Sequence, residues 1–397
     1  MQFKTPAQRT AGFQESVIRE MTRLGEITNS VNLSQGLPEM SPPPEILQAA
    51  SQAIFDGENQ YTFPFGLAEF RQALAQKYAD YNKIICDPEL EVTVTCGVSE
   101  AMISTILALT DPGDEVIIFE PWYENYIPDC IMAGVTPRFY KLEEPDFSID
   151  INKLGLLANS KTRLLIINTP HNPTGKVFSR EELVLLADLC NKHDIIAVTD
   201  EIYEHILYDG TEHISLGSLP GMENRTVTIC GLGKTYAVTG WRVGWTIANK
   251  SLTALIRKVH DYLTVCAPAA FQKAGITALK LRKSYYSEMQ SAYAQSRSIL
   301  MDALHEAGFS AFSPQGAYYV MANFNNIPWP EEKYQQPKWT RDRAFAEFLA
   351  REVGVAVVPG SSFYHNKIDG KNLVRFNFAN LKGTLEEAAQ RLVQYKH

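Results

Sequence analysis

The stretch RTVTICGLGKTYAVTGWRVGWTIA, residues 225–248, holds two short, mostly apolar runs separated by a glycine-rich turn. We expect both runs, Arg225–Cys230 and Val243–Ala248, to be strands. Similar runs occur upstream, and we expect strands at Glu91–Thr95, Glu115–Phe119, Arg163–Asn168 and Ile195–Thr199. Short apolar strands suit a sheet that is covered on both faces. Helical patterns lie between several of them, at Ser99–Leu109 and Glu181–His193, so the sequence predicts a mostly parallel α/β sheet.

The two ends of the chain have a different pattern. Ser16–Leu24 carries apolar residues on one helical face, and Arg341–Val353 reads as a helix stopped by Gly354. Leu373–Phe378 alternates like a strand, and Thr384 with Glu387 predicts a capping box that opens a last helix. These α and β elements predict a second, smaller α+β domain built from both ends.

The composition excludes several classes of protein. The chain has 397 residues, 45% of them hydrophobic, and a net charge of −8 with no basic run, so we expect no nucleic-acid partner. No apolar stretch has the length of a membrane span, and the N-terminus shows no signal peptide. Six scattered cysteines predict reduced thiols and a cytoplasmic location. Neither Cys nor His residues cluster, so we expect no metal site.

Lys234 follows two glycines, Gly231 and Gly233, at the end of a predicted strand. Gly233-Lys234-Thr235 resembles the tail of a phosphate-binding P-loop, but the first glycine of that motif would fall on Thr228. A dinucleotide fingerprint would need a third glycine where Tyr236 stands. Both nucleotide interpretations are therefore weak, and a lone lysine in this setting is most often a solvated surface residue.

Polar groups follow several of the other predicted strands. Asp200-Glu-Ile-Tyr203 follows one strand, Asn168-Thr-Pro-His-Asn172-Pro-Thr-Gly175 follows another, and Gly97-Val98-Ser99 lies between a strand and a helix. In open parallel sheets the ligand crevice lies at the carboxyl ends of the strands. We therefore expect these groups to meet Lys234 there.

With these motifs the chain resembles the fold-type I pyridoxal-phosphate (PLP) enzymes, in particular the class I/II aminotransferases and their kynurenine/glutamine/methionine branch. The motifs that carry the resemblance, in the family's order, are Asn32-Leu-Ser-Gln-Gly36-Leu37-Pro38, the Asn168 to Gly175 stretch, Thr199-Asp200-Glu-Ile-Tyr203, Lys234-Thr-Tyr with Gly240-Trp-Arg242-Val-Gly244, and Val374-Arg375-Phe376.

The resemblance implies the aspartate aminotransferase-like fold, with a seven-stranded, mostly parallel sheet. It implies an N-terminal arm and part of the small domain at 1–45, a large PLP-binding domain at 46–288 and a C-terminal small domain at 289–397.

The resemblance also implies a role for each polar group around the cofactor. Lys234 would hold PLP as a Schiff base and carry the substrate proton. Asp200 would pair with the pyridine nitrogen, although an aspartate after a strand can instead be a helix N-cap. Tyr203 and Asn172 would bind the phenolic oxygen. Tyr123 would stack on the ring, with its neighbour Trp122 as the alternative.

The cofactor phosphate would be held by the amides of Val98 and Ser99 and by Arg242. The family usually has Ser or Thr three positions before the lysine, where this chain has Gly231. Ser99, Thr239 or water would have to replace that hydroxyl, or phosphate binding would be weaker.

Two further groups of residues complete the predicted site. Tyr61 matches a tyrosine that reaches the phosphate of the neighbouring subunit, which implies a homodimer. Arg375 would clamp the substrate carboxylate, helped by the amide of Gly36 or Leu37; the alternative is a surface arginine on an edge strand.

The activity that the resemblance implies is transfer of an amino group from an L-amino acid to a 2-oxo acid by a ping-pong mechanism. A PLP-dependent C–S β-lyase could use the same site. A non-catalytic aminotransferase-like sensor is a remote alternative, because it would need a further DNA-binding domain. Val265 and Cys266 fall at pocket positions of the resembling branch and favour aromatic, methionine or glutamine donors, with aspartate possible. No arginine for a second substrate carboxylate is evident from the sequence.

Overall fold

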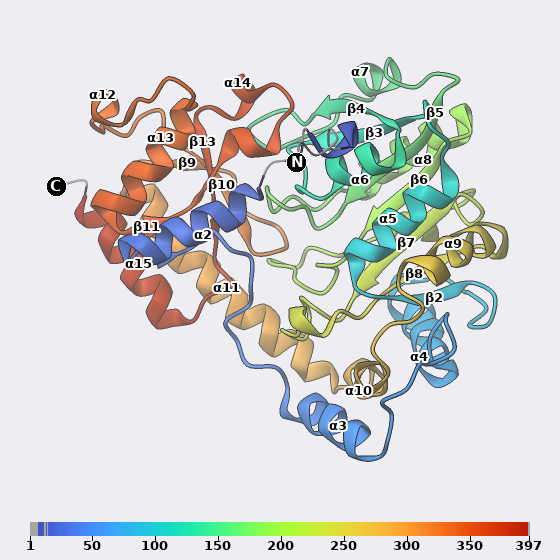
Figure 1. Ribbon diagram of the computed structural model, residues 1–397. Coiled ribbons are helices and arrows are strands. Elements are labelled where there is room, and N and C mark those ends of the chain that lie inside the picture. Colours follow the sequence, from blue (N-terminus) through green and yellow to red (C-terminus); the bar gives the residue numbers. More distant parts are fainter. Residues whose placement is uncertain (1–6, 12, 14, 396–397) are drawn as a thin grey trace, which may run out of the picture.

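The computed structural model describes residues 7–11, 13 and 15–395. Its centre is a seven-stranded sheet (Figure 1) in which six strands run in the same direction and β8 runs in the opposite direction. In spatial order the strands are β2 (Val92–Thr95), β8 (Gly244–Ala248), β7 (Thr226–Gly231), β6 (Ile196–Asp200), β5 (Thr162–Asn168), β3 (Glu115–Glu120) and β4 (Thr136–Lys141). The predicted mostly parallel sheet is confirmed.

Six of these strands begin and end within one residue of the boundaries expected from their apolar runs. The exception is β4, for which the residues gave no signal. It lies at the edge of the sheet, most of its residues are not buried, and it contains Pro137 and Arg138. An edge strand with one solvated side tolerates proline and charge, so it lacks the apolar run that marks a central strand.

Helices cover both faces of the sheet, as continuous apolar strands require. On one face Ile166 and Val198 pack in a cluster with residues of α5 (Val98–Leu109), α6 (Tyr126–Ala133) and α9 (Lys250–Leu263). On the other face the neighbouring strand residues, Leu165 and Ala197, pack against α8 (Arg180–His193). Side chains alternate along a strand, so each strand supplies both cores. A Ser179–Glu182 capping box starts α8.

Both ends of the chain form the smaller α+β part. Figure 1 shows the N-terminal helix α2 (Val17–Thr28) and the C-terminal helix α15 (Lys382–Gln394) in the same part of the molecule, and both contact the strand at Val355–Ala356. Two short parallel strands, β1 (Val31–Asn32) and β11 (Val355–Ala356), join the two ends directly. The remaining elements of this part are the antiparallel sheet β12 (Val358–Pro359), β13 (Leu373–Asn377), β10 (Tyr319–Asn323) and β9 (Ser310–Ala311), with α11 (Lys283–Glu306) and α13 (Arg341–Phe348).

The terminal helices differ in detail from their predictions. The capping box at Thr384 is wrong: α15 begins at Lys382, and the Thr384 hydroxyl donates to Glu39 Oε2 at 3.1 Å. The hydroxyl is hydrogen-bonded to a residue of the N-terminal segment, and a local sequence pattern cannot show such a distant partner. The helix expected to run to Val353 is α13, followed by a π-helical turn (Leu349–Val353) that ends at Gly354 with φ +77°.

The remaining helices are short or lie at the periphery of the sheet. They are α1 (Gln8–Ala11), α3 (Pro44–Phe55), α4 (Ala68–Lys77), α7 (Ile151–Gly155), α10 (Ala269–Leu279), α12 (Glu331–Tyr334) and α14 (Lys367–Gly370). α10 packs against α3 and α4. Within the described ranges, no helix has both the length and the apolar character needed to cross a membrane.

Gly231 ends β7 where three backbone segments come into contact. It pairs with Gly244 of β8, and a side-chain carbon on Gly231 would lie 2.8 Å from the Val243 carbonyl oxygen and 3.1 Å from Gly244 Cα. A carbon on Gly244 would in turn lie 2.6 Å from the carbonyl carbon of Gly97. Backbone atoms cannot rotate away as a flexible side chain can, so a side chain at position 231 has no room here.

We therefore predict that Gly231→Ser destabilises the protein by about 1–3 kcal/mol, the usual cost of overpacking. Urea denaturation measures the change. Gly240→Ser is the matched control, because a carbon added to Gly240 meets no atom within 4 Å. Equal stability of the two variants would contradict the prediction.

Candidate active site

A cavity of about 240 Å³ lies where β5, β6 and β7 end. The last residues of these strands, Asn168, Asp200 and Gly231, all line it. The carboxyl ends of parallel strands therefore meet here as expected. Of the twelve residues predicted for the site, eleven line the cavity: Gly36, Leu37, Val98, Ser99, Tyr123, Asn172, Asp200, Tyr203, Lys234, Arg242 and Arg375.

Lys234 points its amine across the cavity, where Nζ donates to the Gly36 carbonyl oxygen at 2.9 Å. Burial, with the nearby cations Arg375 and Arg242, lowers the pKa of Lys234 to about 8. Removing an ammonium from water and placing it near like charges both favour the neutral amine. Lys234 is thus an amine whose neutral, nucleophilic form is favoured, and not a solvated surface residue.

Asp200 is a buried carboxylate in the same cavity. Its Oδ2 accepts from the Tyr126 hydroxyl at 2.8 Å, and its Oδ1 accepts from the Ile202 amide at 3.3 Å. Burial is the main cause that raises the pKa of Asp200 to about 6, while Lys234 opposes the shift. Asp200 is followed directly by turns and not by a helix, which excludes the N-cap interpretation. A carboxylate in this setting favours a cationic partner.

The opposite side of the cavity is rich in donors. Gly97, with φ +80°, precedes α5, whose N-terminus has no side-chain cap. The amides of the first helical turn, at Val98 and Ser99, have no partner within a helix and attract anions. The Arg242 guanidinium lies beside them, donating to the carbonyls of Thr239 and Cys96 at 3.0 and 3.4 Å. This end of the cavity is built for an anion such as a phosphate.

Arg375 is fully buried, with 1% of its surface exposed, which excludes a surface role. Its guanidinium donates to Asn172 Oδ1 at 3.0 Å and to the Ser34 carbonyl oxygen at 2.6 Å. Among the described atoms its Nε has no hydrogen-bond partner. A buried, incompletely paired guanidinium favours a carboxylate ligand.

The Gly36–Leu37 segment leaves one amide for such a ligand. The Leu37 amide is used within the chain, donating to the Gln35 carbonyl oxygen at 2.9 Å. Gly36 is tightly confined, because a side-chain carbon there would lie 1.8 Å from the Tyr319 hydroxyl oxygen. Of the two predicted amides, Gly36 therefore suits the role better.

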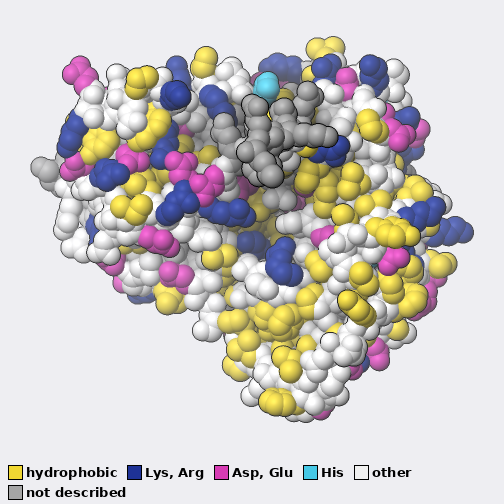
Figure 2. Space-filling model, viewed as in Figure 1, with side chains coloured by type: hydrophobic (Ala, Val, Ile, Leu, Met, Phe, Trp, Pro, Cys, Tyr) yellow, Lys and Arg dark blue, Asp and Glu magenta, His cyan; other side chains and the backbone are white. Residues whose placement is uncertain are grey.

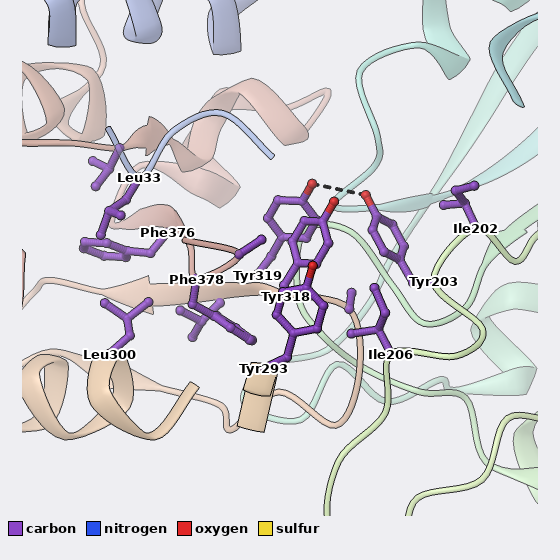
Figure 3. Packing of buried hydrophobic residues seen from close by; sticks show 14 of the residues in the cluster. Leu33, Ile202, Tyr203, Ile206, Tyr293, Leu300, Tyr318, Tyr319, Phe376 and Phe378 are labelled. Atoms are coloured by element: carbon purple, nitrogen blue, oxygen red, sulfur yellow. Dashed lines mark hydrogen bonds between the residues drawn. The ribbon is translucent and has the colours of Figure 1, made fainter. Parts of the chain in front are cut away.

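Tyrosines form much of the cavity wall. Figure 3 shows Tyr203 pointing at Tyr319, and their hydroxyl oxygens lie 3.1 Å apart. Tyr123 lines the cavity, while Trp122 does not line it and instead packs against Phe139 with ring centroids 4.9 Å apart. The structure thus favours Tyr123 over Trp122 for ring stacking.

Sequence reasoning missed two of these tyrosines, Tyr126 and Tyr319. Tyr126 lies three positions after Tyr123, a spacing that places two side chains close together where the chain turns helically. Tyr319 lies on β10 of the smaller part, and its ring stacks with the Arg375 guanidinium at 4.5 Å. Tyr319 becomes a candidate only once the fold brings β10 to the cavity.

Opposite charges lie on the wall where the N-terminal segment meets the loop between β3 and α6. Ser16, Arg19 and Glu124 all line the cavity, and the Ser16 hydroxyl lies 2.6 and 2.9 Å from the two carboxylate oxygens of Glu124. Arg19 is exposed and forms no ion pair with another residue of the described chain. The sequence had offered no second cation near the site, and the structure places Arg19 in the cavity wall.

Tyr61, the twelfth predicted residue, does not line this cavity, and 80% of its surface is exposed. Val265, 41% exposed, and Cys266 are likewise outside it. The loops that carry these residues are held together by buried Gln272, whose side-chain amide donates to Thr62 Oγ1 and to the Ala267 carbonyl oxygen.

Comparison with known proteins agrees with this geometry. The family model for aminotransferase class I and II matches residues 28–392. The kynurenine–oxoglutarate transaminase of Dictyostelium discoideum is 35% identical, over 98% of this chain and 96% of its own length.

Two solved structures are similar over almost the whole chain. YbdL of Escherichia coli, described as having a methionine aminotransferase function, has a TM-score of 0.92 at 32% identity and covers 98% of this chain and all of its own. Aspartate aminotransferase of Thermus thermophilus with maleate has a TM-score of 0.89 at 31% identity and covers 99% of this chain and all of its own. The chain therefore belongs to the class I and II aminotransferases, a PLP-dependent family with the aspartate aminotransferase fold.

Proposed function

We propose that Lys234 is the residue that holds PLP and carries the substrate proton in this aminotransferase. The observation that supports this most directly is the convergence of the Lys234 amine, the buried Asp200 carboxylate and the incompletely paired Arg375 guanidinium on one cavity. PLP, when bound, supplies an electron sink for negative charge at the substrate α-carbon. With a pKa near 8, Lys234 Nζ can accept the α-proton and release it again near neutral pH.

Each remaining group has a cofactor atom that matches its chemistry. Asp200 pairs with the pyridine nitrogen, because a cation there satisfies the buried carboxylate. Asn172 keeps its amide nitrogen for the phenolic oxygen, since its Oδ1 already accepts from Arg375. The Tyr203 hydroxyl donates to the same oxygen, and the Tyr123 ring stacks on the pyridine.

The remaining donors divide between phosphate and substrate. The amides of Val98 and Ser99, with Arg242, hold the phosphate. Ser99 and Thr239 line the same cavity as Gly231 and can supply the hydroxyl that Gly231 lacks. Arg375 and the Gly36 amide bind the substrate α-carboxylate.

Lys234→Ala tests the central role. The wild-type protein with PLP should absorb in the visible range, and an amino donor should shift this absorption to the near ultraviolet. The variant should lose the visible band, and its turnover should fall by about 10²–10⁴-fold or more. Lys283→Ala, which changes an exposed lysine on α11, is the control. A Lys234→Ala protein that transaminates at the normal rate would refute the assignment.

We propose further that Arg19 receives the second carboxylate of an acidic 2-oxo acid acceptor. Arg19 and Arg375 line one cavity, and two separate cations match a molecule with two carboxylates. The Dictyostelium discoideum relative is named for oxoglutarate, a dicarboxylate. Glu124 lies in the same wall, but both of its oxygens are within hydrogen-bond distance of Ser16, which offsets part of its repulsion.

Arg19→Gln should raise KM for 2-oxoglutarate by about tenfold, because the loss of one charge-assisted hydrogen bond weakens binding by about that factor. KM for pyruvate, which has a single carboxylate, should change by less than about twofold. Steady-state kinetics with both acceptors measures the two changes in KM. Arg23→Gln is the control: Arg23 lies on the same helix but pairs with Glu15 outside the cavity. An equal rise for both acceptors would exclude the specific role.

We also propose a homodimer in which Tyr61 reaches the phosphate held by the neighbouring subunit. Figure 2 shows hydrophobic side chains gathered over α3 and the segment that follows it, where Phe55 and Tyr61 are 86% and 80% exposed. Large exposed aromatic side chains in one region favour a protein partner. Val265 and Cys266 belong to the same surface in this proposal and would help to shape the pocket of the partner.

Two further assignments complete the proposal. The domain limits in this proposal are 1–45, 46–288 and 289–397; the limit after 288 falls in the first turns of α11, which thereby connects the large and small domains. A cytoplasmic location is supported by the six cysteines, all of which are free thiols.

A further inference from the structure

A buried ion pair lies beneath the anion-binding end of the cavity without lining it. Glu100, in the first turn of α5, and His260, on α9, expose 7% and 0% of their surfaces. Glu100 Oε1 lies 2.8 Å from His260 Nδ1, and Glu100 Oε2 accepts from the Cys96 amide at 2.8 Å. On its other side, His260 Nε2 lies 2.8 Å from the Pro64 carbonyl oxygen.

The partners of His260 determine its protonation. A carbonyl oxygen can only accept, so Nε2 must carry a proton toward Pro64. The carboxylate of Glu100 also accepts, so Nδ1 carries a second proton when Glu100 is ionised. Burial lowers the pKa of His260, but the hydrogen bond and charge of Glu100, the Pro64 carbonyl and Asp261 together leave the pKa raised. The geometry and this direction both favour a charged pair in which Nδ1 donates to the Glu100 carboxylate.

Through Glu100, the pair fixes the turn that aims the phosphate-binding amides. The Cys96 amide that Glu100 binds directly precedes Gly97, whose left-handed φ of +80° turns the chain into α5. In an ordinary capping box the third helical residue binds the amide of the N-cap itself. Here Glu100 binds the amide one residue earlier, so it holds the approach to the helix and leaves the amides of Val98 and Ser99 directed at the cavity.

Through His260, the same pair holds the loop that carries Tyr61. Pro64 lies three residues after Tyr61, and its carbonyl oxygen is bound to His260. The neighbouring Phe65 is fixed as well, because its carbonyl accepts from the Val94 amide at 3.0 Å and the Arg257 guanidinium stacks on its ring at 3.9 Å. Tyr61 itself remains exposed, at the end of an anchored loop.

We infer that Glu100 and His260 are positioning residues for the cofactor phosphate: Glu100 sets the amides of the chain's own site, and His260 sets the Tyr61 loop that serves the neighbouring site. This inference rests on the proposed phosphate role of Val98, Ser99 and Tyr61. It assigns one buried pair in each chain to donors of two sites, so in a dimer each pair would support its own phosphate site and that of the neighbouring subunit.

The test compares binding of PLP with binding of pyridoxal, which has the same ring and aldehyde but no phosphate. Apoprotein is titrated with each, and absorbance gives the two dissociation constants. Glu100→Ala should weaken PLP binding by tenfold or more and pyridoxal binding by less than twofold. A general defect in folding or in the ring pocket would weaken both equally, and that result, or no loss at all, would overturn the inference.

Two variants make the comparison sharper. Glu100→Gln can keep both contacts, because its oxygen accepts from Cys96 while its nitrogen donates to a neutral His260. It should therefore retain most of the preference for PLP, and a loss as large as that of Glu100→Ala would count against a positioning role. Ser104→Ala changes a buried residue one turn further along α5 and should leave both affinities unchanged.

A double-mutant cycle tests the part of the inference that concerns Tyr61. Tyr61→Phe and His260→Asn should each weaken PLP binding, and the double variant should lose less than the product of the two fold-changes, because both act on the same contact. If the two fold-changes in PLP affinity multiply fully in the double variant, the proposed link between His260 and Tyr61 is overturned. Wild-type protein that shows no preference for PLP over pyridoxal would instead refute the proposed function itself.

Discussion

The buried carboxylate of Asp200 is the constraint on which the arrangement of the site depends. An unpaired charge inside a protein costs several kcal/mol, and partial pairing removes only part of that cost. Tyr126 and the Ile202 amide each give one hydrogen bond, yet burial still raises the pKa of Asp200 to about 6. The carboxylate is thus prepared for a cation that the chain does not provide in full, and the pyridine nitrogen of PLP is such a cation.

The substrate end of the cavity depends on both structural parts of the molecule. Arg375 comes from β13 of the smaller part, yet it donates to Asn172 in the loop after β5 and to Ser34 in the N-terminal segment. Tyr319 of β10 meets Tyr203 in the same way. A substrate carboxylate would therefore bind a guanidinium that contacts from two other segments hold in place, and its affinity would depend on how the two parts are placed against each other.

Residues that follow a strand of the parallel sheet, or that stand in a motif of the resembling family such as Arg375, could be placed at the cavity from the sequence. Residues with neither signal could not. Asp200, Asn172 and Lys234 each follow a strand, and the parallel topology alone places them at one edge. Tyr319 and Arg19 lie on elements far from these motifs, and no periodicity shows that β10 or α2 reaches the cavity. The same limit explains the capping box: Thr384 had a suitable local partner in sequence, but Glu39, 345 positions away, takes its hydroxyl.

Gly231 gives the phosphate end its particular character. Because β7 and β8 approach too closely for a side chain there, Gly231 offers no hydroxyl, and the proposed donors are backbone amides and the Arg242 guanidinium, with Ser99 and Thr239 as the nearby hydroxyls. A hydroxyl donor can be introduced by the side chain at one position. A backbone amide can be directed at a ligand only when the turn that contains it is held in one conformation. Glu100 binds the Cys96 amide in that turn, and its charge is balanced by His260, inside the protein and away from the cavity. The loss of a donor at one position thus increases the importance of a pair that never touches the ligand.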